Sequence, residues 1–164
     1  METAKYVKPA LALIAAVLIC LAAGGIGSIF TAQSTITGWY ANLQKPSFTP
    51  PNWLFGPVWT ALYILMGIAV FLVWQKDLQN PAVKTALLFF AVQLILNTAW
   101  SWLFFGLNYI LLAFIELLIL WLAILLTILK FYSLSATAFL LMLPYIIWVS
   151  FAAVLNGSIW LLNR

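Results

Sequence analysis

The sequence predicts an all-α membrane protein in which five transmembrane helices form a single bundle. Hydrophobic residues make up 66% of the 164 residues and charged residues only 6%, with a mean hydropathy of +1.14. Soluble proteins carry roughly 25% charged residues, so this chain has too few to cover a surface that faces water. The hydrophobic residues also gather into stretches long enough to cross the hydrocarbon core of a bilayer. Helices are expected because an open sheet cannot satisfy its backbone in lipid and a barrel would show alternating polarity.

The five predicted helices follow one another through short connections and one long connection. They cover about residues 9–30, 53–75, 81–105, 109–130 and 135–162. The last three connections are short, so the helices that they join are expected to be antiparallel neighbours. We therefore predict one integral membrane domain over residues 1–164, with no separate soluble domain.

The long connection, residues 31–52, has a composition of its own. It contains Trp39 and Tyr40, followed by prolines at positions 46, 50 and 51. The prolines exclude regular helix around them and stiffen the backbone. Connections longer than about 12–15 residues are usually functional. We predict that residues 31–52 form a capping loop over one mouth of the bundle.

The distribution of positive charge predicts the orientation. In a five-helix protein the N-terminus shares one side of the membrane with the second-to-third and fourth-to-fifth connections. That side carries Lys5, Lys8, Lys76, Lys84 and Lys130, against Lys45 and Arg164 on the other. Because cytoplasmic segments carry an excess of Lys and Arg, we expect the N-terminus in the cytoplasm and the capping loop outside.

Several functional classes are excluded by missing residue types. The chain has no histidine and one cysteine, Cys20, which argues against a metal site, a disulfide and a histidine-dependent hydrolase. The lysines and arginines that give the net charge of +4 form no basic stripe along the sequence, so we expect no nucleic-acid partner. Glu116 is the only acid inside a predicted helix, and three roles stay open for it: a hydrogen bond between helices, a proton relay or a contact with a ligand.

Polar and aromatic residues share faces of three predicted helices by their i, i+3 and i+4 spacing. The faces are Phe55, Trp59 and Tyr63; Gln93, Asn97, Trp100, Ser101 and Phe104; and Tyr145, Trp148, Ala152 and Asn156. Such polar groups can simply join helices, for about 0.6–2 kcal/mol each. However, Trp59, Trp121 and Trp148 lie too deep for the interfacial belt that usually holds tryptophan. Aromatic walls with a few polar groups describe a cavity for a large planar ligand, and both interpretations remain open.

The most specific motifs lie in the capping loop and the helix after it. They read WYANLQKPSFTPP over residues 39–51 and GPVWTALY over residues 56–63. Further matching segments are LNTAW at 96–100, FFG at 104–106, PYIIW at 144–148 and LN at 155–156. With these motifs the chain resembles the translocator protein family, which comprises the tryptophan-rich sensory proteins of bacteria and the peripheral benzodiazepine receptor of mitochondria. The resemblance extends in order from about Gly27 to Trp160.

The resemblance implies five helices, a homodimer and a pocket that binds porphyrins and synthetic isoquinoline or benzodiazepine compounds. Carried over to this sequence, the ligand-binding residues are Tyr40, Pro50, Trp59, Tyr63, Asn97, Trp100, Trp148 and Ala152. Protoporphyrin IX is the expected ligand, with no cofactor required. Because histidine is absent, a metal-free porphyrin suits the chain better than haem.

The resemblance leaves three functions open. The protein would bind porphyrin in order to sense, transport or dispose of it, would break it down in light as an enzyme, or would act as a small-molecule transporter. The C-terminal part departs from the cholesterol motif of animal members, because Val154 and Leu155 are followed by neither the tyrosine nor the nearby base. This departure gives no support for sterol binding and suggests a bacterial protein in the cell membrane.

Overall fold

A computed structural model describes the backbone of residues 3–164 and the side chains of residues 9–34 and 37–164. The helices are α1 (Thr3–Thr37), α2 (Trp39–Asn42), α3 (Asn52–Trp74), α4 (Pro81–Ser101), α5 (Ile110–Tyr132) and α6 (Ala136–Leu162). A short π-helix, η1 (Trp102–Gly106), continues α4. Helix accounts for 84% of the structure and the described residues contain no strand, which confirms the predicted fold class.

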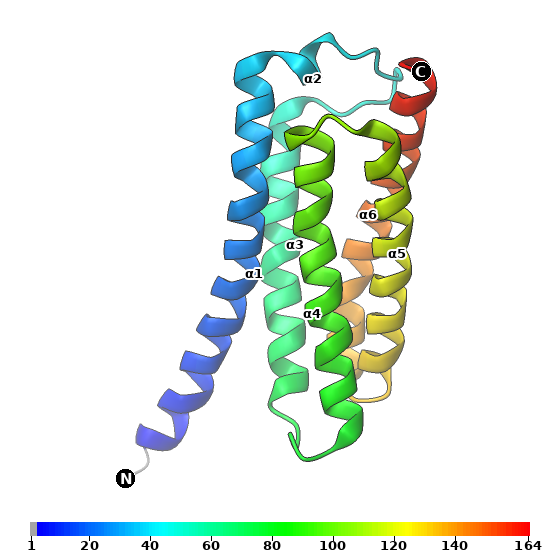
Figure 1. Ribbon diagram of the computed structural model, residues 1–164. Helices are drawn as coiled ribbons and strands as arrows, with labels where there is room; N and C mark the ends of the chain where they lie inside the picture. The colour runs from blue at the N-terminus through cyan, green and yellow to red at the C-terminus, as the bar shows by residue number, and fades with distance from the viewer. Residues whose placement is uncertain (1–2) are drawn as a thin grey trace.

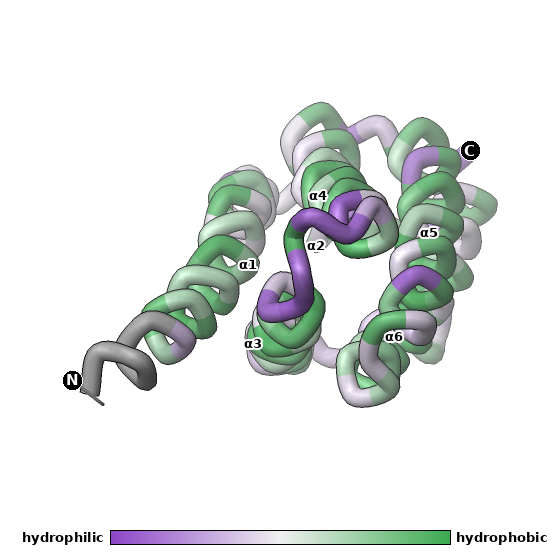
Figure 2. Tube along the Cα trace, turned by 90° about the horizontal axis from the view of Figure 1, so that it is seen from below, coloured by the Kyte–Doolittle hydropathy of each residue, from purple (hydrophilic) through white to green (hydrophobic). Residues whose placement is uncertain are grey.

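Five of these helices are long and apolar enough to cross a membrane, as the sequence predicted. In the bundle α1 packs against α3 and α4, α3 packs against α6, and α5 lies between α4 and α6 (Figures 1 and 2). Hydrophobic residues run along the helices, whereas hydrophilic residues gather in the connection between α3 and α4 (Figure 2). The first half of α1 leans away from the other helices (Figure 1), and Leu11, Ile14 and Leu18 there are exposed for lipid to cover.

The first helix ends later than the sequence analysis placed it. Residues 31–37 were expected in the capping loop, but α1 continues through them to Thr37. Their polar side chains were wrongly interpreted as a loop; such residues mark the exit from the hydrocarbon but do not break a helix. The break comes at Gly38, whose φ of 69° is the left-handed conformation that glycine adopts without strain. The connection that covers the bundle is therefore residues 38–51, which we call the lid.

Hydrogen bonds fasten the lid to the end of α6. The backbone N–H of Gln44 donates to Asn163 Oδ1 at 3.0 Å, and Asn163 Nδ2 donates to the Gln44 carbonyl at 2.8 Å. Within the lid, Lys45 Nζ donates to the carbonyls of Ala41 and Leu43 and lies 4.7 Å from the centre of the Tyr40 ring. The lid is thus held in one position at the open end of the bundle.

Glycines bring α1 close to α3. A Cβ added to Gly67 would lie 2.5 Å from the Cα of Val17, so the backbone of α1 occupies the space that a side chain would need. A Cβ on Gly24 would collide with the ring of Tyr63. The contacts at these two glycines close the seam between α1 and α3 over its membrane-buried middle, as small residues do in other membrane helices.

Replacing Gly67 with alanine is expected to destabilise the protein by about 1–3 kcal/mol, the usual range for an overpacked core. The added methyl meets backbone, which cannot rotate away as a flexible side chain can. Thermal unfolding in detergent, followed by circular dichroism, measures this effect. Gly25→Ala is the matched control, because a Cβ there meets nothing within 4 Å. Equal melting temperatures for Gly67→Ala and the control would show that α1 is not held against α3 at this point.

Candidate ligand-binding cavity

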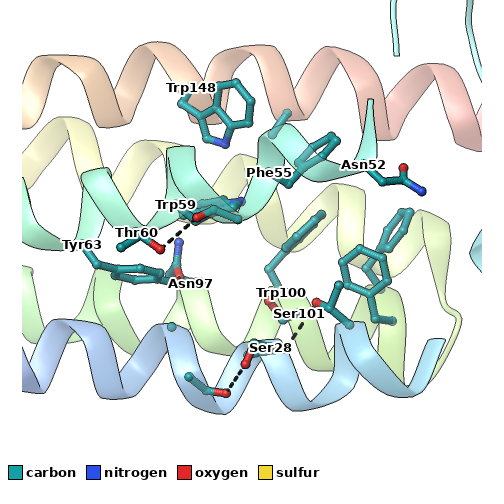
Figure 3. A pocket seen from close by; sticks show the side chains of 18 of the residues that line it. Ser28, Asn52, Phe55, Trp59, Thr60, Tyr63, Asn97, Trp100, Ser101 and Trp148 are labelled. Carbon is teal, nitrogen blue, oxygen red and sulfur yellow. Dashed lines mark hydrogen bonds between the residues drawn. The ribbon is translucent and has the colours of Figure 1, made fainter. Parts of the chain in front are cut away.

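A cavity of about 520 Å³ lies between α1, α3, α4 and α6, beneath the lid. Its walls come from these four helices, from η1 and from one lid residue. The lining residues are Leu21, Gly24, Gly25, Gly27, Ser28, Thr31, Tyr40, Asn52, Phe55, Gly56, Trp59, Thr60, Tyr63, Asn97, Trp100, Ser101, Phe104, Phe105, Trp148, Ala152, Leu155, Asn156 and Ile159. Figure 3 shows the labelled side chains directed into this space from different helices.

Most residues that the sequence selected lie together at this cavity. Tyr40, Trp59, Tyr63, Asn97, Trp100, Trp148 and Ala152 all line it. Pro50 does not, which corrects the expectation that it covers the site. The proline-containing part of the lid contacts α6 instead, where the ring centres of Phe48 and Phe151 lie 6.4 Å apart. Neither of these rings lines the cavity.

For Trp121, whose depth left both a structural role and a place in a cavity wall open, the structure shows the structural role. Trp121 lies outside the lining, and its indole Nε1 donates to Ser150 Oγ at 2.8 Å, a bond that joins α5 to α6. Glu116 likewise does not line the cavity. It is only 8% exposed, and neither carboxyl oxygen has a hydrogen-bond partner among the described residues.

The contribution of α1 was missed by the sequence analysis. Gly24, Gly25, Gly27 and Ser28 form one side of the cavity. The signal was present as small residues repeating at spacings of four, but that pattern predicts close packing of a helix and does not reveal a nearby open space. In the structure some of these residues pack closely and others do not.

Asn97 forms the floor of the cavity by linking three helices. Its Oδ1 accepts a hydrogen bond from the hydroxyl of Tyr63 on α3, and its Nδ2 donates to the hydroxyl of Tyr145 on α6 at 3.0 Å. Asn97 is 3% exposed, and Tyr145 is fully buried. A carboxamide offers one acceptor and one donor group in fixed directions, and here each holds a tyrosine. The main role of Asn97 in the structure is therefore to hold α3, α4 and α6 in position.

A second bridge crosses the cavity nearer the lid. Trp100 Nε1 donates to Asn156 Oδ1 at 3.1 Å, and Asn156 Nδ2 donates to the carbonyl of Ile110 at 3.0 Å. These bonds link α4, α6 and the start of α5. The Trp100 ring then stacks on Phe104, with centroids 5.3 Å apart and planes at 22°. The π-helical turn that holds Phe104 begins two residues after Trp100, and π-helical turns are frequent at functional sites.

Aromatic rings form the remaining walls. Trp59 stacks on Tyr63 with centroids 5.6 Å apart, and Phe55 meets the ring of Trp148 edge-on at 5.8 Å. The indole N–H groups of Trp59 and Trp148 make no hydrogen bond with any described residue, unlike that of Trp100. They are thus two polar donors that an occupant of the cavity can use.

The cavity carries no charged side chain among its lining residues. Burial of the Tyr40 side chain raises the pKa of its hydroxyl further above physiological pH, so this hydroxyl is neutral. In the described part of the chain no group of His, Cys, Asp or Glu side chains is placed to hold a metal ion. The arrangement therefore suits binding of a neutral aromatic surface by stacking and a few hydrogen bonds.

Comparison with known proteins identifies the family of the chain. The sequence model of the TspO/MBR family matches residues 16–161. This chain belongs to the TspO/MBR family. It is 49% identical over 153 residues to the "Tryptophan-rich protein TspO" of Archaeoglobus fulgidus, covering 93% of this chain and 97% of that protein. It is 41% identical to the human "Translocator protein" over 74% of this chain and 73% of that protein. It is 37% identical to the "Tryptophan-rich sensory protein" of Cereibacter sphaeroides, over 89% of this chain and 90% of that protein. Like its family, the chain is an integral, multi-pass membrane protein.

The Asn97→Leu substitution is expected to destabilise the protein, because the hydroxyls of Tyr63 and Tyr145 then lose a buried partner. An unsatisfied buried polar group costs about 1–3 kcal/mol. The same substitution in a Tyr63→Phe, Tyr145→Phe background removes no such bond and is expected to cost much less. Thermal unfolding of the four proteins in detergent measures both differences. An equal cost in the two backgrounds would mean that the bridge does not hold the helices.

Proposed function

We propose that this TspO/MBR family member binds a planar tetrapyrrole of the protoporphyrin IX type in the cavity under the lid, in order to sense, transport or dispose of it. The observation that carries the proposal is the aromatic wall of a cavity of about 520 Å³. Cavities that bind small ligands measure about 300–1,000 Å³ and are mostly apolar, with a few directed polar groups. Synthetic isoquinoline or benzodiazepine compounds are flat and aromatic as well, and we propose the same site for them.

The chemistry of the walls fits a large flat ring. Trp59 and Trp148 offer indole faces for offset stacking, worth about 0.5–1.5 kcal/mol per pair beyond the area buried. Their free N–H groups can donate to polar edges of the ligand. The carboxylates of a porphyrin would lie best at the lid end, because the Lys45 ammonium lies over the ring of Tyr40, a residue of the lining, although Lys45 itself does not line the cavity. No charged side chain of the protein would lose its solvent when the ring enters, because none lines the cavity.

Protoporphyrin IX is expected to quench the tryptophan fluorescence of the protein in detergent in a saturable way. Trp148→Ala is expected to weaken this binding at least tenfold, about 1.4 kcal/mol. Trp53→Ala is the matched control, because Trp53 is 71% exposed and does not line the cavity. Unsaturable quenching, or equal binding by Trp148→Ala and Trp53→Ala, would indicate partition of the pigment into the micelle and contradict the proposal.

A second candidate function is light-dependent breakdown of the bound porphyrin. It is favoured by the position of Trp59 and Trp148 at the cavity wall, where electron-rich indoles would touch a photoexcited ring. Under this function, illumination in air bleaches bound protoporphyrin IX faster in the wild-type protein than in Trp148→Ala at equal occupancy. Equal bleaching rates would mean that the protein binds the pigment without catalysing its breakdown. In that case, uptake of the pigment by vesicles that contain the protein would favour transport.

The environment of the protein follows from the same proposal. We propose that it resides in a cell membrane with its N-terminus in the cytoplasm, because Lys76, in the connection after α3, and Lys130, in the last turn of α5, lie on the N-terminal side. The family resemblance supports a homodimer as the assembly.

A further inference from the structure

Two glycines in the transmembrane helices make no close contact with another helix of this chain. Gly25 on α1 and Gly56 on α3 are both exposed, and a Cβ added to either meets nothing within 4 Å. A glycine inside a helix costs about 1 kcal/mol relative to alanine. At Gly24 and Gly67 this cost is offset by close helix contact, whereas at Gly25 and Gly56 it is not. Both of them line the cavity, so what they provide there is open space.

The packing of α1 on α3 brings these two glycines to one seam. Contact of Val17 with Gly67 and of Gly24 with Tyr63 fixes the antiparallel register of the two helices. Continuing that register toward the lid brings Ser28 of α1 level with Thr60 and Gly56 of α3. Gly25 and Ser28 are three residues apart and Gly56 and Thr60 four, so each pair lies on one face of its helix.

The seam is therefore closed in its lower part and open above. Below, Gly67 and Gly24 bring backbone and ring into contact. Above, Gly25, Ser28, Gly56 and Thr60 are exposed and line the cavity. Because a Cβ on Gly25 or Gly56 would meet no other atom within 4 Å, the seam is not closed at this level. We call these four residues the slot.

We infer that the slot is a lateral opening through which a flat apolar ligand passes between the lipid bilayer and the cavity. This inference rests on the proposed function and adds the route of entry. Gly25, Ser28 and Thr60 lie inside the transmembrane spans Pro9–Ser34 and Asn52–Trp74, so the slot faces lipid and not water. The substrate class is accordingly a molecule that has already partitioned into the membrane.

The rim of the slot suits such a passage. The Ser28 hydroxyl donates to the carbonyl of Gly25 at 2.7 Å, and the Thr60 hydroxyl donates to that of Gly56 at 2.9 Å (Figure 3). Each hydroxyl thus donates its hydrogen bond within its own helix. A passing apolar ligand therefore breaks no hydrogen bond of these hydroxyls and is held only weakly at the rim. The lid end, by contrast, is fastened by the two hydrogen bonds between Gln44 and Asn163.

The test is the kinetics of protoporphyrin IX binding to the full chain in phosphatidylcholine nanodiscs, by stopped-flow quenching of tryptophan fluorescence. Gly25→Leu and Gly56→Leu place a bulky side chain in the slot, on different helices. We expect each to slow both association and dissociation roughly tenfold, since a plug obstructs passage in both directions. Ala91→Leu, on the exposed face of α4 away from the cavity, is the matched control and is expected to bind at the wild-type rates.

Each other outcome overturns a stated part of the account. Saturable binding with unchanged rates in both leucine variants removes the slot as the route and leaves the proposed function standing. Faster dissociation without slower association makes Gly25 and Gly56 contact residues and also removes the route. Faster association in Asn163→Ala, which releases the lid, establishes entry under the lid instead. Absence of saturable binding in the wild-type protein contradicts the proposed function itself. Failure of a leucine variant to fold contradicts the open space around that glycine.

Discussion

Three helices of the bundle meet through the side chain of Asn97, and the shape of the cavity depends on that meeting. In lipid no water is present to satisfy a buried hydroxyl or amide, so each must find its partner inside the protein. Asn97 gives the hydroxyls of Tyr63 and Tyr145 their partners and thereby sets the spacing of α3, α4 and α6. Below this level the side chains fill the bundle, and above it the helices surround a space.

The open space above Asn97 persists because its walls cannot collapse. Trp100 is tied to Asn156, and Asn156 to the backbone at the start of α5, so this wall is fixed by polar bonds. Trp59 rests on Tyr63 and Trp148 on Phe55, and large flat rings already supported by one another have few rotamers with which to fill a void. The same rings and bonds that stabilise the bundle thus leave a preformed cavity of fixed shape, which lowers the entropic cost of binding a rigid ligand.

The sequence predicted those features that depend on local pattern. Apolar length identified the five membrane helices, and helical spacing placed Trp59, Tyr63, Asn97 and Trp148 on the faces that meet at the cavity. It failed where tertiary packing decides. Polar residues after position 30 suggested a loop, although only Gly38 ends α1. Depth in the membrane could not distinguish Trp121, which bonds to Ser150, from Trp148. Nor can spacing alone separate Gly24, which packs closely, from Gly25, which borders open space.

The most direct test of the central claim is a structure of the protein crystallised in a lipid phase with protoporphyrin IX. The account predicts the tetrapyrrole beneath the lid between α1, α3, α4 and α6, in contact with Trp59 and Trp148. It also predicts that the bridge from Tyr63 through Asn97 to Tyr145 is intact. A pigment bound only on the lipid-facing surface, or a floor whose hydrogen bonds are broken by the ligand, would contradict it.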